Sequence, residues 1–141
     1  MGGIASSQLG KINFQEKEII NFPKGIIGFS EKKNYLLLEP EECKPFKWLQ
    51  SIDDSNLAFV LIDPFVFFPD YQIKPSPEDL TELEQNNLKQ LKIYVIVTLS
   101  PDPSQTSANL IAPLIFNFKK NLGRQIVLTK SPYTIRHFLL K

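Results

Sequence analysis

The sequence contains one cysteine, Cys43, and one histidine, His137, among its 141 residues. A lone cysteine excludes a disulfide within the chain and is typical of proteins in a reducing compartment. One cysteine and one histidine also fall short of the four ligands that a structural zinc site needs. We therefore expect a cytoplasmic protein that binds no metal.

Patterns for membrane insertion, nucleotide binding and catalysis are absent as well. No run of about 20 apolar residues occurs, and the start, MGGIASS, lacks the regions of a signal peptide. The two glycine-rich patterns that bind nucleotide phosphates, GxxxxGK(S/T) and GxGxxG, are both absent. A nucleophile–base pair would have to use His137, near the C-terminus in IRHFLL, which is a poor place for a fixed base. We expect no membrane association, no cofactor and no enzyme activity, although a hydrolase pair of distant carboxylates stays open.

Charge is nearly balanced overall but unevenly distributed. The net charge of +1 argues against general nucleic-acid binding. Residues 53–84 carry eight acids against one base, Lys74, whereas residues 85–141 carry eight bases against one acid, Asp102. Folding can intermix the two sets. Alternatively, the middle of the chain forms an acidic surface suited to a basic partner.

Short alternating or apolar runs separated by turn residues dominate the chain. This pattern predicts a mainly β fold, a compact antiparallel barrel-like structure with a short helical cap. No linker divides residues 1–141, so we expect one domain. Residues 1–7 are the exception: Met1, Gly2 and Ser6 fit a myristoylation acceptor, but a disordered or vector-derived terminus explains them better. The expected strands cover residues 11–14, 16–22, 35–38, 45–51, 57–62, 93–99, 106–112, 114–118 and 125–129, with a last segment at 133–140.

Three local signals refine this prediction. Ser76, followed by Pro77 and two acids, is a helix start, and polar residues inside the leucine stripe that follows predict one broken helix or two short ones. The run at 93–99 is so apolar that it must be a central strand. Asn121-Leu122-Gly123 is typical of a hairpin turn. The glycines of FPKGIIGF have the GxxG spacing of some RNA-binding loops, but the isoleucines between them favour a structural turn.

The stretch LIDPFVFFPDYQIKP, residues 61–75, is harder to interpret. A buried strand does not need acids at its ends, and a solvent loop does not need three phenylalanines. The stretch is either a buried corner, with Phe65 and Phe67 inward, or a surface that another molecule covers. An apolar centre with a charged rim is typical of protein-binding surfaces. The candidate partner-binding residues are Asp63, Phe67, Phe68, Asp70 and Tyr71.

Six stretches, in this order and spacing, resemble the FliW family of flagellar assembly factors over about residues 8–140. The most specific are the blocks DPFVFFPDY and ANLIAP. One departure is Ile27, where the family pattern GIPGF has proline, and a β-branched residue can replace proline in an extended turn. The full set is FPKGIIGF, PFKWLQS, LAFVLIDPFVFFPDY, IYVIVTL, SANLIAPLIFN and the final GRQIVL with YTIRHFL.

The resemblance implies a cytoplasmic protein without catalysis that binds two partners. One is the C-terminal region of flagellin, and the other is CsrA, the RNA-binding repressor of flagellin translation. Flagellin that accumulates would bind the protein and leave CsrA free to repress flagellin translation. Export of flagellin would free the protein, which would then capture CsrA. CsrA has to be basic to bind RNA, so the acidic middle segment suits it, and an amphipathic flagellin segment would need an apolar groove.

Two other function classes stay open from the residues alone. A small-ligand β-barrel needs an apolar cavity with a few converging polar groups. An RNA-binding barrel needs a basic face with exposed aromatic rings, for which Lys119, Lys120 and Arg124 beside Phe116 and Phe118 are the only candidates. For Asn109, we favour a role in bonding backbone groups at a strand end.

Overall fold

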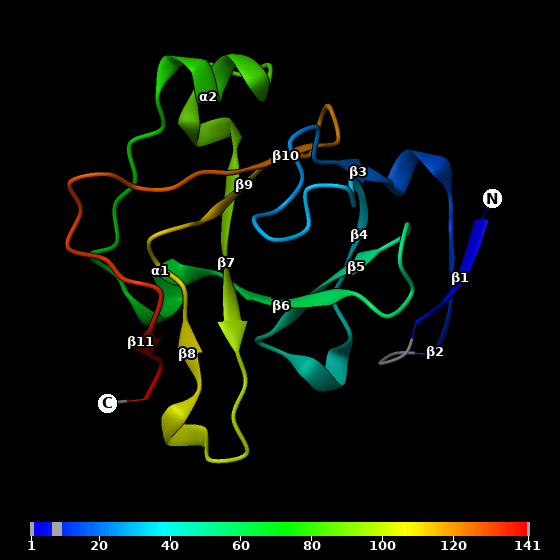
Figure 1. Cartoon of the computed structure of the whole chain (residues 1–141), viewed down its shortest axis with the longest axis horizontal. Coiled ribbons are helices and arrows are strands. Elements are labelled where there is room, and N and C mark those ends of the chain that lie inside the picture. Colours follow the sequence, from blue (N-terminus) through cyan, green and yellow to red (C-terminus); the bar gives the residue numbers. More distant parts are fainter. Residues whose placement is uncertain (1, 7–9, 141) are drawn as a thin grey trace.

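The computed structural model describes residues 2–6 and 10–140 (Figure 1). Strands dominate it, as the alternating patterns predict. They are β1 Gly2–Ser6, β2 Gly10–Phe14, β3 Ile20–Asn21, β4 Asn34–Leu38, β5 Lys47–Ser51, β6 Ala58–Ile62, β7 Lys92–Thr98, β8 Ser107–Ala108, β9 Leu114–Asn117, β10 Leu122–Gln125 and β11 His137–Phe138.

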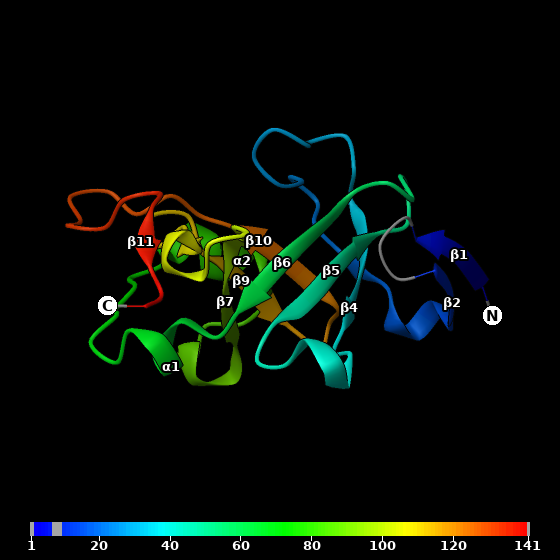
Figure 2. The ribbon, with the colours of Figure 1, turned by 90° about the horizontal axis from the view of Figure 1, so that it is seen from below.

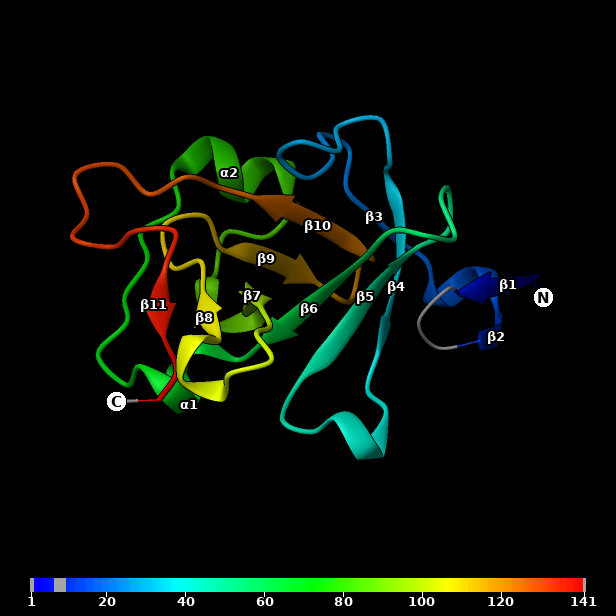
Figure 3. The same ribbon diagram turned by 60° about the horizontal axis from the view of Figure 1, so that its bottom comes forward.

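Seven strands close into a barrel. Around the ring, hydrogen-bonded neighbours follow the order β7, β6, β5, β4, β3, β10, β9, and β9 pairs back onto β7 (Figures 1 and 3). Every pairing is antiparallel except the single contact between Asn21 of β3 and Leu122 of β10. At the far end of β7, Val97 and Thr98 pair instead with β8, which carries β11 at its outer side. The predicted barrel-like fold and the central position of the 93–99 run are therefore confirmed.

Both faces of the β6–β7–β9 wall are buried, which explains why these strands are so apolar. Alternate residues point into the barrel, where Leu61, Tyr94 and Phe116 pack with Phe22 and Tyr35. The other residues of the same strands face a second core outside the barrel. That outer core lies beneath α1, α2 and the C-terminal segment, and it includes Ile62, Leu83, Val95, Leu110 and Ile115.

The helical region consists of short pieces, as predicted. Helix α2, Pro77–Glu82, begins at Ser76, whose side chain accepts a hydrogen bond from the Asp79 amide at 3.1 Å. It ends where Glu84 adopts a φ of +55°, and a 3-10 turn at Leu88–Gln90 follows. In Figure 1, α2 lies over one end of β7 and β9 and so caps that end of the barrel. The remaining helices are α1 Pro64–Phe67 and 3-10 turns at Glu16–Glu18, Glu41–Cys43 and Pro103–Gln105.

Several predicted strands are shorter than expected, and of the strand predicted over 125–129 only Gln125 lies in a strand, at the end of β10. The strand predicted over residues 16–22 forms only at Ile20–Asn21, because Glu16–Glu18 wind into a 3-10 turn in which Glu18 accepts from the Gln15 amide at 2.8 Å. The strand predicted over 106–112 forms only at Ser107–Ala108. Beyond it, the Asn109 side chain accepts from the Ala112 amide at 3.2 Å, which confirms its predicted role at a strand end.

The hairpin turn predicted at Asn121-Leu122-Gly123 is displaced. The chain turns through residues 118–121, and Leu122 already begins β10. Gly123 is needed for a different reason: a Cβ atom there would lie 2.3 Å from the ring of Phe22. The glycine therefore gives the Phe22 ring its place in the barrel. The FPKGIIGF stretch is a structural turn, as predicted, with φ of +67° at Gly25 and +88° at Gly28.

The N-terminal segment forms a small sheet of its own. Within the described residues, Gly2–Ser6 forms β1 and pairs with β2 in a separate two-stranded sheet. Gly10, with a φ of +75°, lies at the start of β2, where left-handed backbone favours glycine. The expectation that residues 1–7 are a disordered or vector-derived terminus stays a prediction, and Met1 and residues 7–9 lie outside the described part.

Candidate protein-binding surface

The stretch from Asp63 to Tyr71 forms a one-turn helix followed by a tight bend, which neither sequence interpretation anticipated. Asp63 caps α1 by accepting a hydrogen bond from the Phe65 amide at 2.9 Å, and Pro64 occupies the first helical position. A helical turn spreads consecutive side chains over different directions. Phe65 and Val66 are exposed as a result, by 40% and 67%, so the buried-corner alternative is wrong for Phe65.

Tyr71 belongs to the core. Its side chain is only 3% exposed, and its hydroxyl donates a hydrogen bond of 2.6 Å to the Leu110 carbonyl. Its ring lies against Tyr133, with the centroids 4.7 Å apart. Burial raises the pKa of this phenol well above its ordinary value, with a further contribution from Tyr133. We therefore correct the expectation that Tyr71 is exposed to a partner: in this structure it supports the surface from beneath.

Phe68 and Phe67 lie between the core and the surface. Both are partly buried against the outer core. Phe68 packs beneath β11, with its ring centroid 6.0 Å from that of His137. Phe67 instead lines an open groove, so it is the candidate aromatic residue that a partner can reach.

The groove beside Phe67 is apolar and has a volume of about 400 Å³. No charged side chain lines it, and the hydroxyls of its two polar residues both accept backbone hydrogen bonds, Thr106 from the Ser100 amide at 3.1 Å and Ser100 from the Asp102 amide at 3.2 Å. Four segments meet here: the approach to β5, α1, the connection from β7 to β8 at residues 99–106, and the C-terminal segment (Figure 2). We call it the apolar groove; its apolar lining is Pro45, Phe46, Phe67, Leu99, Pro103, Leu139 and Leu140.

Sequence reasoning missed most of this groove because its members come from distant segments. Leu99 was assigned to the central strand, yet it lies one residue past the end of β7 and is 51% exposed. Leu140, in the final IRHFLL stretch, is 56% exposed. Two exposed leucines at the ends of strands were the available signal, although singly exposed apolar residues are common on proteins.

Acidic groups lie near one end of α1. Burial raises the pKa of Tyr94, and the charges of Glu39 and Asp63 raise it further, which places both carboxylates near that ring. Lys47 lies over the same ring at 5.6 Å and forms an ion pair of 2.8 Å with Glu39. Asp63 therefore keeps a charge not matched by an ion pair among the described residues. Asp70, the other predicted acid, is exposed beyond the far end of α1.

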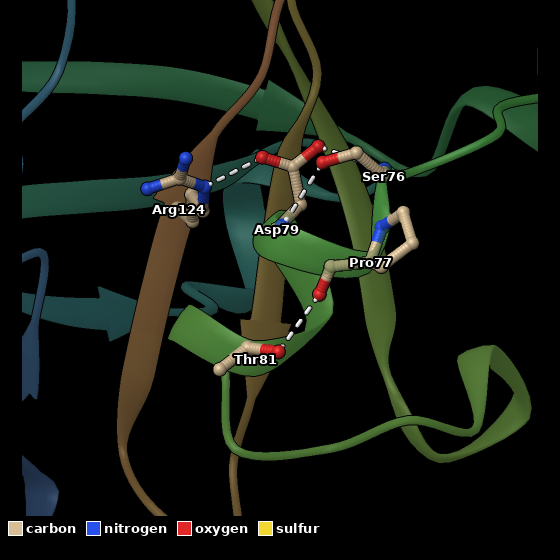
Figure 4. Close-up of polar contacts among 5 residues, drawn as sticks. All are labelled: Ser76, Pro77, Asp79, Thr81 and Arg124. Carbon is tan, nitrogen blue, oxygen red and sulfur yellow. Dashed lines mark hydrogen bonds and ion pairs between the residues drawn. The ribbon is translucent and has the colours of Figure 1, made fainter.

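The acidic and basic halves of the sequence meet in one ion pair among the residues described. Arg124 of β10 donates to Asp79 of α2 at 2.8 Å, and both side chains are mostly buried (Figure 4). Burial alone would raise the pKa of Asp79, but hydrogen bonds from the Ser76 amide and from Arg124 hold it below its ordinary value. This pair fixes the helical cap to the barrel. The other acids of residues 53–84 form no ion pair with a base of residues 85–141 in the described part of the chain.

Other chemistry finds little support in the part of the chain that the structure covers. No cluster of three potential metal ligands is found there, and no described helix has the length and apolar character to cross a bilayer. The aromatic face needed for RNA binding is reduced to the exposed Phe118, Lys119 and Lys120, because Phe116 is fully buried and Arg124 is held by Asp79. The barrel interior is likewise filled by the packed side chains described above rather than hollow.

Comparison with known proteins agrees with the fold and the sequence blocks. The family model described as FliW protein matches residues 3–139. The chain belongs to the FliW family. A FliW-family protein of Clostridium botulinum, named flagellar assembly factor FliW, is 45% identical over 132 residues, covering 94% of each chain. One of the same name from Natranaerobius thermophilus is 47% identical over 138 residues, covering 95% of this chain and 89% of that protein.

A solved FliW structure matches the whole architecture. It is titled as the crystal structure of the flagellar assembly factor FliW and superposes with a TM-score of 0.94 at 40% identity. The match covers 99% of this chain and 98% of the other. The closed barrel with its short helical cap is therefore the FliW fold.

Proposed function

We propose that this FliW-family chain is a non-catalytic flagellar assembly factor of the bacterial cytoplasm. In this proposal it binds the C-terminal region of flagellin and the translational repressor CsrA, and it relieves repression by exchanging one partner for the other. Two kinds of observation support it: relatives named as flagellar assembly factors, and a surface suited to protein partners.

The apolar groove is the observation that carries the proposal. It offers apolar side chains and two satisfied polar groups, with no charge to desolvate. An amphipathic segment that places alternate apolar side chains into such a groove gains their burial, about 25 cal/mol per Å² of apolar surface. We assign the flagellin segment to this groove and CsrA to the acidic groups around α1, including Asp63 and Asp70.

Binding measurements on variants of α1 test the assignment. Phe67→Ala removes the aromatic wall of the groove and should weaken flagellin binding by about 1–2 kcal/mol in calorimetry. Val66→Ala is the matched control, because Val66 lies on the same helical turn, is 67% exposed and does not line the groove. Equal affinity of wild type, Phe67→Ala and Val66→Ala for flagellin would place the flagellin site elsewhere.

Charge reversal tests the second partner separately. Asp70→Lys should slow association with CsrA, and added salt should weaken the wild-type complex, because an exposed rim charge acts mainly on the encounter. Glu31→Lys is a suitable control, since Glu31 is exposed and lies in the loop before β4, away from α1. If Asp70→Lys and Glu31→Lys change the association rate equally, the effect comes from net charge rather than from this face.

A further inference from the structure

A second cleft, on a different part of the molecule, has no role in the function proposed above. It has a volume of about 680 Å³, within the range of about 300–1,000 Å³ common for ligand-binding clefts. Its two walls are the segment 72–76, which leads into α2, and the segment 126–130, which continues β10. We call it the edge cleft; the residues that matter here are Gln72, Lys74, Val127, Thr129, Lys130 and Tyr133.

Residues 126–128 continue the pairing of β10 past its end at Gln125, and the chain then bends at Thr129 and Lys130, where Lys130 has a φ of +53°. On its inner side the amides of Ile126 and Leu128 donate to the carbonyls of Pro113 and Ile111, at 3.1 and 2.7 Å. In an extended chain the amides between them point the opposite way. Those of Val127 and Thr129 donate no hydrogen bond to any other residue that the structure describes. The amides of Val127, in the extended part, and of Thr129, at the bend, are therefore available to a ligand in the cleft, which both residues line.

The side-chain charge of the cleft that no ion pair neutralises is positive. Lys74 and Lys130 both line it, one on each wall, and neither forms an ion pair within the described residues. The lining includes one carboxylate, Asp79, which is already engaged by Arg124 at 2.8 Å. A ligand that fills the cleft thus meets two unmatched ammonium groups, which favours acidic side chains.

The walls are held in place without a ligand. The Tyr133 hydroxyl accepts a hydrogen bond from the Gln72 amide at 3.1 Å and so ties the two walls together at one end. The Tyr133 ring in turn lies against the buried Tyr71. At the other end, the Asp79–Arg124 pair joins α2 to β10 (Figure 4). Such preorganisation lowers the entropy cost of binding.

We propose that the edge cleft binds an extended, acidic peptide segment of a partner protein, which pairs with the open edge of residues 126–128. The Val127 and Thr129 amides donate to the backbone of the segment, and Lys74 and Lys130 contact its carboxylates. Addition of a strand to an exposed edge is a common mode of peptide recognition, in which backbone hydrogen bonds supply affinity and side-chain contacts supply specificity. This site is separate from the apolar groove and does not depend on the function proposed for it.

Selection from a displayed library of random linear peptides tests the proposal with the full chain. Peptides are selected on wild type after depletion on the Lys74→Glu/Lys130→Glu variant, so that only ligands dependent on the two lysines remain. We expect acidic sequences with alternating apolar residues. A selected peptide, once synthesised, should bind the Lys74→Glu/Lys130→Glu variant with an affinity at least about tenfold lower than its affinity for wild type. It should bind the control variant Lys24→Glu/Lys120→Glu, with the same charge change elsewhere, nearly as well as wild type.

Hydrogen exchange locates the peptide and separates this site from the groove. Bound peptide should slow exchange of the Val127 and Thr129 amides, and Phe67→Ala should leave its affinity unchanged. Three results would overturn the proposal: no peptide survives depletion, the surviving peptides lack acids, or protection appears at α1 instead. If no peptide survives and Lys74→Glu/Lys130→Glu self-associates, the lysines serve to guard an open edge against pairing.

Discussion

The hydroxyl of Tyr71 joins the turn after α1 to a segment 39 residues further along the chain, through the carbonyl of Leu110. Tyr71→Phe keeps the ring in place but leaves that buried carbonyl without its donor. An unsatisfied buried acceptor costs about 1–3 kcal/mol, and we expect a loss of that size in the free energy of unfolding, measured by urea denaturation. Tyr133→Phe is the control: its hydroxyl bonds an exposed amide that water can satisfy, so its effect should be smaller.

Asp79 makes stability depend on pH. Its pKa in the folded chain lies below the ordinary value of 3.8, because hydrogen bonds from Ser76 and Arg124 outweigh the effect of burial. The carboxylate therefore contributes stability at neutral pH, and that contribution is lost as pH falls through the folded pKa. Asp79→Asn should cost about 1–2 kcal/mol at pH 7. By urea denaturation, the difference in unfolding free energy from wild type should narrow as the pH falls below the ordinary pKa of 3.8; a difference independent of pH would contradict the assignment.

Among the elements, β10 packs closely against the ring of Phe22 at Gly123. A methyl group added at Gly123 would lie 2.3 Å from the Phe22 ring, inside the barrel. Gly123→Ala should lower the free energy of unfolding by about 1–3 kcal/mol through overpacking. Phe22→Leu provides the space that the methyl group needs, so the double variant should lose less than the sum of the two single losses. Strict additivity in this cycle would show that the two positions do not interact.

At the scale of elements, the sequence predicted the features that neighbouring residues determine. It missed the features that depend on contacts between residues far apart in the chain. Alternation and turn residues identified most strands, and Ser76-Pro77 identified the start of α2. The same kind of signal, Asp63-Pro64, begins α1, but the phenylalanines beside it favoured a strand or loop. The burial of Tyr71 could not be read locally, because the Leu110 carbonyl that satisfies its hydroxyl is remote in sequence. The apolar groove was missed for the same reason, since four separate segments build it.

At the scale of the whole molecule, the barrel wall is shared by two cores, so the chain should unfold as one unit. Val95 is fully buried in β7, which pairs with β6, β8 and β9. Val95→Asp places an unpaired charge in the outer core, at a cost of several kcal/mol against a total stability of about 5–15. We expect circular dichroism and size-exclusion chromatography to show loss of the folded monomer. Thr98→Asp, exposed at the end of the same strand, should stay folded and melt in one transition.

The position of the last residues bears on how the protein is best handled in the laboratory. Leu139 and Leu140 form part of the lining of the apolar groove, whereas β1 lies at the opposite end of the molecule (Figures 1 and 2). An affinity tag or fluorescent fusion at the C-terminus would therefore crowd the groove and compete with whatever occupies it. The same fusion attached ahead of β1 would leave the groove open. Capture of partners from cell extracts is thus better attempted through the N-terminal end, and a C-terminal fusion serves as a blocked comparison.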